Sequence, residues 1–215
     1  MDVGHRGAGT SFKVTSGGSI RENTIASLKR AGESGAAFVE FDVQLSKDLH
    51  PVIYHDFHVY VSLKKKATMD ANDMLELPMR ELTLEQLKNL KVYHVVEGRN
   101  RQEKFFDEDL SEHQPFPELA EALTVIDQKI GFNIEVKWAQ LLENGTMEDD
   151  HLPIDKNLYV DRILDIVLEK ADSRRIVFSC FDADVCVMLR NKQNIYPVMF
   201  LTLGISKRYP KYKNP

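Results

Sequence analysis

Six short runs of the chain have the apolar pattern of β-strands. The clearest is FVEFDVQL at residues 38–45, in which polar and apolar residues alternate over most of the run. Glu40, Asp42 and Gln44 therefore share one face of that strand. Pro51 opens another run at the first strand position, where no ladder donor is lost. The predicted strands cover residues 3–6, 38–45, 51–56, 132–137, 176–181 and 196–203.

Amphipathic runs with the spacing of α-helices separate most of these strands. Thr83 with Gln86 three residues later forms a capping-box pattern, and Gly35 is a helix stop signal. The predicted helices cover residues 24–33, 84–90, 117–126, 158–171 and a last stretch that starts at Asp182 or Asp184. This alternation predicts an α/β fold with a parallel sheet. A charged insertion at about 58–116 and a polar loop at 139–157 interrupt it.

The composition is that of one soluble globular domain spanning residues 1–215. The chain is 43% hydrophobic and 28% charged, with a formal net charge of −5. No basic face dominates, which argues against nucleic acid as a partner. The sequence lacks an apolar run of the ~18 residues that span a membrane, and it does not open on a signal-peptide pattern. Cys180 and Cys186 are expected to be reduced, packed thiols of a cytoplasmic protein.

Three carboxylates lie on strands that should be buried. Glu40 and Asp42 share a face of one predicted strand, and Glu135 lies on another. Burying such groups is costly unless they are paired or bind a metal. In a (β/α) barrel the strand ends converge at one mouth, so these carboxylates would meet there. They predict a hard-oxygen site for a divalent cation, with Mg²⁺ preferred and Ca²⁺ as the alternative.

Two histidines and two cations accompany the carboxylates. His5 and Arg6 end the first predicted strand, His55 ends the third, and Lys137 ends the fourth. Histidines act as acid and base near neutral pH, and arginine and lysine bind anionic groups. A metal site, two imidazoles and fixed positive charge together indicate phosphoryl chemistry rather than hydride or acyl transfer.

Competing signals are weaker. The glycines of residues 4–9 stand in the order G-x-x-G-x-G, which is not the dinucleotide fingerprint, and the P-loop Lys-Ser/Thr is missing. We expect His58 to lie on the loop after the third strand, and the basic run at 64–66 to be a solvated loop. Cys180 is expected to pack rather than to act as a nucleophile. Trp138 is expected to pack beneath a loop, with an aromatic site for a quaternary ammonium as the alternative.

In their order along the chain, the motifs that carry this chemistry resemble the glycerophosphodiester phosphodiesterase (GDPD) family. They are HRG at 5–7, ENT at 22–24, EFDV at 40–43, HD at 55–56, EVK at 135–137 and SCFD at 179–182. Stretches such as ENTIASL and RRIVFSCFDAD are most similar to the eukaryotic branch that acts on glycerophosphocholine and carries a starch-binding-type domain before its barrel. The resemblance implies a TIM-type (β/α) barrel of the phospholipase C-like phosphodiesterase type. It also implies hydrolysis of glycerophosphodiesters, with glycerophosphocholine giving sn-glycerol 3-phosphate and choline.

The resemblance further implies a role for each site residue. By position, the metal ligands are Glu40, Asp42 and Glu135, the acid–base pair is His5 and His55, the phosphate contacts are Arg6 and Lys137, and the supporting pair is Glu22 and Asn23. Asn23 fits equally well as the N-cap of the helix that follows it.

The chain departs from the family pattern at its C-terminal side. It has about six predicted strands, whereas barrel closure takes eight and typically ~250 residues. We therefore expect an incomplete barrel, as in a fragment, a short isoform or an incomplete gene model. Two alternative functions stay open: a catalytically inactive chain with a binding or regulatory role, and a sphingomyelinase D-like phospholipase. The expected partner is a small glycerophosphodiester, and the oligomeric state stays open.

Overall fold

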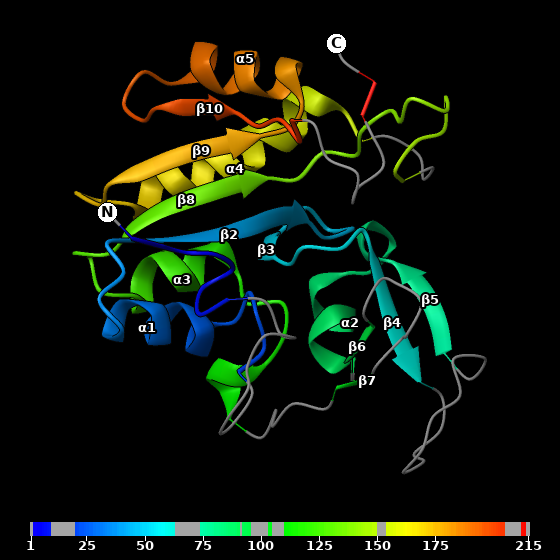
Figure 1. Ribbon diagram of the computed structural model, residues 1–215, viewed down its shortest axis with the longest axis horizontal. Helices are drawn as coiled ribbons and strands as arrows, with labels where there is room; N and C mark the ends of the chain where they lie inside the picture. The colour runs from blue at the N-terminus through cyan, green and yellow to red at the C-terminus, as the bar shows by residue number, and fades with distance from the viewer. Residues whose placement is uncertain are drawn as a thin grey trace.

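The main sheet is a row of parallel strands (Figure 1). The computed structural model describes residues 2–9, 20–62, 74–90, 92–95, 103–104, 110–149, 154–204 and 212–213, so the basic run at 64–66 lies outside the described residues. In spatial order the parallel strands are β1 (Val3–Gly4), β2 (Phe38–Leu45), β8 (Gly131–Val136), β9 (Ile176–Cys180) and β10 (Val198–Phe200). All but β8 lie within a predicted run, and β8 begins one residue before its run at 132–137. The predicted parallel sheet is confirmed.

The third predicted strand is antiparallel to its neighbour, whereas all six strands were expected to be parallel. Strand β3 (Pro51–Ile53) pairs antiparallel with β2, with Leu45 opposite Pro51. Residues 46–50 connect the two strands, and the Ser46 amide donates to the His50 carbonyl across this turn at 3.0 Å. Five residues are too few for the crossover that a parallel pair needs, so the chain can only form a hairpin here.

Four helices pack against the main sheet. They are α1 (Ile25–Glu33), α3 (Leu119–Val125), α4 (Lys156–Lys170) and α5 (Ala183–Lys192). Asp182 is the N-cap of α5, and its side chain accepts the Val185 amide. Figure 1 shows α1 and α3 beside β2, and α4 behind β8 and β9. In the part of the chain that the structure describes, no helix has the length and apolarity to cross a membrane.

The predicted insertion contains a second, antiparallel sheet. Its strands, in the order β5-β4-β6-β7, are β5 (Met74–Pro78), β4 (His58–Ser62), β6 (Val92–Val95) and β7 (Glu103–Lys104). Its helices are α2 (Leu84–Asn89), with the predicted capping box, and the short 3₁₀ helices η2 (Met79–Glu81) and η3 (Ser111–His113). Val59, Met79, Leu87 and Phe116 pack with Val52 of β3 in a separate core, which holds this unit against the hairpin.

The polar loop after β8 folds back on itself. Leu141 bridges Met147, and the Gln140 amide donates to a Glu148 carboxylate oxygen at 3.2 Å. The Arg80 guanidinium, from η2, donates to the buried Asp149 carboxylate at 2.8 Å. This ion pair joins the second sheet's unit to the loop that follows Lys137.

Both ends of the main sheet present an edge among the described strands. Strand β1 pairs with β2 and β10 pairs with β9, and the side chains of Met199 and Phe200 on β10 are about half exposed. Exposed apolar edges favour pairing with other chains. We expect the 215-residue chain expressed alone to associate or to unfold in part, and to lack activity. Size-exclusion chromatography and thermal unfolding test this, and a monomer that melts cooperatively would contradict it.

Candidate active site

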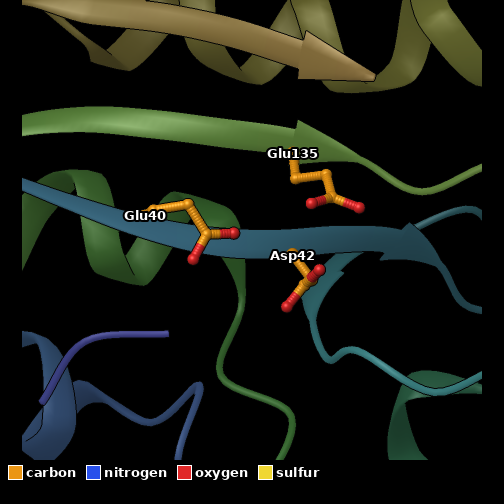
Figure 2. A group of neighbouring side chains, drawn as sticks. All are labelled: Glu40, Asp42 and Glu135. Carbon is orange, nitrogen blue, oxygen red and sulfur yellow. The ribbon is translucent and has the colours of Figure 1, made fainter. Parts of the chain in front are cut away.

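Three carboxylates converge at one end of the main sheet. Glu40 and Asp42 point to the same face of β2, and Asp42 lies directly opposite Glu135 of β8 in the strand register. One oxygen from each of the three carboxylates lies within 4.8 Å of the others (Figure 2). The predicted convergence is therefore present, since residues two apart on a strand and their neighbour on a parallel strand face the same side.

The cluster concentrates negative charge in a place with little water. Burial and the charge of Asp42 raise the pKa of Glu40 to about 9, and the same two causes raise the pKa of Glu135. Burial also acts to raise the pKa of Asp42, but the charges of His55, Lys137 and Arg6 outweigh it and lower that pKa. A divalent cation would remove this repulsion, so the donor set fits a hard metal ion.

Two cations reach the central carboxylate of the cluster. Arg6 Nε lies 3.6 Å from one oxygen of Asp42, and Lys137 Nζ lies 3.9 Å from the other. Lys137 Nζ also donates to Glu135 at 3.2 Å. Burial acts to lower the pKa of Lys137, but Glu135 and Asp42 outweigh it, so the pKa is raised and the side chain stays charged. Both cations are thus fixed next to the predicted metal ligands.

The two predicted histidines lie in turns at the edge of the cluster. His5 Nε2 is 3.9 Å from a Glu40 oxygen, and burial followed by the charge of Arg6 lowers the pKa of His5. His5 is therefore neutral at pH 7 and able to accept a proton. His55 Nδ1 is 2.6 Å from Asp56, which holds the ring in one orientation.

Glu22 and Asn23 each form a hydrogen bond with a residue of this site. Glu22 accepts a hydrogen bond from the Arg6 guanidinium at 2.7 Å. The Asn23 amide donates to an Asp42 oxygen at 2.9 Å. The N-cap of α1 is Thr24 rather than Asn23, so the alternative interpretation of Asn23 as the cap is wrong. Asn23 has the left-handed φ of 55°, and in this position its side chain reaches the cluster instead.

Two supporting residues were absent from the predicted site. Gln44 Nε2 donates to the carbonyls of His55 and Asp56, at 3.2 and 2.9 Å, and so fixes the turn that carries His55. Asp56 orients the His55 ring. Gln44 follows Glu40 and Asp42 on the same face of β2, so the alternation along this strand could have indicated that Gln44 lies next to the site. The Gln44 contacts themselves depend on the β2–β3 hairpin.

The other residues considered from the sequence have different positions. His58 lies on strand β4 rather than on a loop, and its Nδ1 is 3.8 Å from Glu76. The loop assignment was wrong because the pattern of the short β4 run was hidden in a charged stretch. Cys180 is buried in the core and both cysteines are free, as predicted. The Trp138 ring packs edge-on against Tyr159, with Lys156 Nζ 5.1 Å from its centre.

Comparison with known proteins places these residues in a family. The model of the glycerophosphoryl diester phosphodiesterase family matches residues 5–214. The glycerophosphocholine phosphodiesterase GPCPD1 of Homo sapiens is 49% identical over 98% of this chain, and the glycerophosphodiester phosphodiesterase GDPD2 of Arabidopsis thaliana is 29% identical over 93%. The chain spans 32% of the length of the human relative and 52% of the plant relative.

Solved structures support the fold. The chain resembles a glycerophosphodiester phosphodiesterase of Agrobacterium tumefaciens with a TM-score of 0.60 and 20% identity, over 96% of this chain and 69% of that one. It resembles a phosphodiesterase of Oleispira antarctica with a TM-score of 0.59 and 22% identity, over 91% and 63%. The sheet is thus an incomplete barrel of the TIM type. With its family model matched over nearly its whole length, the chain belongs to the glycerophosphoryl diester phosphodiesterase family.

Proposed function

We propose that this chain is the catalytic part of a metal-dependent phosphodiesterase that hydrolyses glycerophosphocholine to sn-glycerol 3-phosphate and choline. The observation that carries the proposal is the cluster of Glu40, Asp42 and Glu135, with Arg6 and Lys137 in direct contact with it. An anionic diester and a divalent cation are the partners that such mixed charges select. The name of the human relative supports choline as the head group.

The three carboxylates would hold the cation, Mg²⁺ in preference to Ca²⁺. When bound, such an ion supplies Lewis-acid stabilisation of negative charge on phosphoryl oxygens. Arg6 and Lys137 provide fixed positive charge for the same phosphate group. Because Glu22, Glu135 and Asp42 hold these two side chains in place, they need no reorganisation as charge develops.

His5 and His55 would move the protons. One imidazole takes the proton of the attacking oxygen, from water or from a glycerol hydroxyl, and the other donates a proton to the oxygen of the leaving alcohol. The phosphorus–oxygen bond to choline breaks as the new bond forms. Where the attacking oxygen is the glycerol hydroxyl, water then opens the resulting cyclic phosphate to give sn-glycerol 3-phosphate. The pKa of His5, below its ordinary value, suits the acceptance of a proton at pH 7.

Two free cysteines lead us to propose a cytoplasmic location as well.

The proposal is tested by assaying hydrolysis of glycerophosphocholine with Mg²⁺, with Ca²⁺ and after chelation with EDTA. Both this chain and a form extended by the final strands of a family barrel, called the extended form below, would be used. We expect turnover by the extended form that EDTA removes and Mg²⁺ restores. Sphingomyelin is the control substrate, and cleavage of it instead would favour a sphingomyelinase D-like enzyme. An inactive extended form would favour a binding role.

Removing either histidine should disable the reaction. In the extended form, His5→Ala and His55→Ala are each expected to lower kcat by about 10²-fold or more, because each removes one proton transfer. His113→Ala is the matched control, since His113 lies in η3 and outside the cluster. Steady-state kinetics on glycerophosphocholine measure the effect. A near-normal rate for His55→Ala would remove that residue from the mechanism.

A further inference from the structure

The buried hydroxyl of Ser27, in helix α1, forms hydrogen bonds with the turn that carries His5 and Arg6. Ser27 is 1% exposed, and its Oγ donates to the Arg6 carbonyl at 2.9 Å. The same oxygen accepts the Ala8 amide at 2.8 Å. Gly7 lies between these two contacts, and a β-carbon on Gly7 would collide with the Ser27 hydroxyl. This side chain therefore holds the turn at residues 5–8 against α1, and the Asn23 amide just before the helix donates to the same Arg6 carbonyl at 3.1 Å.

The turn has a backbone that benefits from such support. Arg6 has a φ of 51° and Gly7 a φ of 85°, so two successive residues are left-handed. For a residue with a side chain this conformation is strained and persists only where the surroundings stabilise it. Both hydrogen bonds of the Ser27 hydroxyl are made to residues that flank Gly7. They favour the strained backbone of the turn over a relaxed one.

The position of this turn also determines the position of a predicted metal ligand. The Arg6 amide donates to Glu40 Oε2 at 2.8 Å, and the Gly7 amide donates to the Glu40 carbonyl at 3.2 Å. The Arg6 side chain reaches Asp42 as well. A shift of the turn would therefore move an imidazole, a guanidinium and a carboxylate oxygen together.

We propose that Ser27 is a positioning residue of this site, whose hydroxyl sets the His5–Arg6 turn at the distance from the carboxylate cluster that the reaction needs. The inference rests on the proposed function. Without the hydroxyl, the Ala8 amide loses its partner and the Arg6 carbonyl keeps only the Asn23 amide, at 3.1 Å, so the turn can relax away from α1. Misplacement by about 1 Å can cost on the order of 10²-fold in rate.

The test compares Ser27→Ala with Ser46→Ala in the extended form. Ser46 is a matched control because it is 2% exposed and its hydroxyl accepts the His50 amide at 3.0 Å and donates to Asp48 at 2.7 Å. We expect the two variants to lose similar thermal stability. Only Ser27→Ala should lower kcat, by about 10- to 10²-fold, and raise the Mg²⁺ concentration that gives half-maximal rate. Equal kinetics for the two variants would overturn the proposal.

Two further measurements keep the proposal separate from the proposed function. Gly7→Ala retains the hydroxyl but displaces the turn, so it should lower kcat as Ser27→Ala does, and a normal rate would count against the proposal. Hydrogen exchange at the Ala8 amide needs no substrate. Faster exchange in Ser27→Ala than in Ser46→Ala is expected even if glycerophosphocholine is not hydrolysed. Unchanged exchange would show that the Ser27 hydroxyl does not hold the turn in place.

Discussion

Glu40→Gln is expected to leave the metal-free fold intact while lowering Mg²⁺-dependent turnover of the extended form on the order of 10³-fold. Glu40 is 8% exposed, and burial with the charge of Asp42 raises its pKa to about 9. At neutral pH and without metal the side chain is therefore protonated, and glutamine has the same shape and charge. Only the metal-bound state needs the carboxylate, so only that state is lost.

The same pKa predicts how the stability of the metal-free protein depends on pH. In the unfolded chain Glu40 ionises near its ordinary pKa of 4.5, whereas in the folded chain it keeps its proton up to about pH 9. Between these values the unfolded state binds fewer protons, so the stability that Glu40 contributes is present at low pH and is lost as the pH rises. Glu40→Gln should remove this part of the slope.

Thermal unfolding in EDTA from pH 5 to 9, together with turnover at pH 7.5, measures both effects. Glu121→Gln is the control, because Glu121 is exposed on α3 and should change neither quantity. Mg²⁺ should raise the melting temperature of the wild type and not that of Glu40→Gln. A variant that keeps Mg²⁺-dependent turnover would show that Glu40 is not a metal ligand.

Arg174→Ala is expected to destabilise the fold by at least about 3 kcal/mol, the largest stability effect we foresee for a single residue. Arg174 is 2% exposed, and its guanidinium stacks 4.0 Å from the centre of the Phe132 ring. It donates to four carbonyls at the end of α3 and in the following turn, those of Leu123, Ile126, Asp127 and Ile130. Alanine would remove a donor from each of these four carbonyls, of which that of Asp127 also accepts the Ile130 amide at 3.0 Å, and it would leave a cavity under Phe132.

Arg175→Ala provides a matched control for this prediction. Arg175 is the next residue, and it also donates to two carbonyls and stacks on a ring, that of Phe38, but it is exposed to solvent. Water replaces its contacts, so a loss of ~1 kcal/mol or less is expected. Arg174→Lys should fall between the two, because lysine keeps the charge but lacks the planar fork. Urea unfolding of the extended form measures all three, and equal losses for the two alanine variants would contradict the argument.

Local sequence determined the elements and the chemistry that they carry. The alternation in FVEFDVQL predicted β2 and placed Glu40 and Asp42 on one face, because residues two apart on a strand must point the same way. Thr83 and Gln86 predicted the start of α2, because a capping box involves only residues within one turn. The convergence of Glu135 with the other two carboxylates followed from the parallel sheet that β–α alternation implies.

Tertiary structure alone decided which partners each side chain has. Strand β3 pairs antiparallel with β2 because a five-residue connection turns the chain back, although its residues read like those of a parallel strand. Arg174 and Ser27 look like ordinary surface residues in the sequence, and they are buried because segments 19 to 51 residues away supply their partners. The raised pKa of Glu40 has the same origin. Burial and the proximity of other charges set it, and both arise only when distant strands pack together.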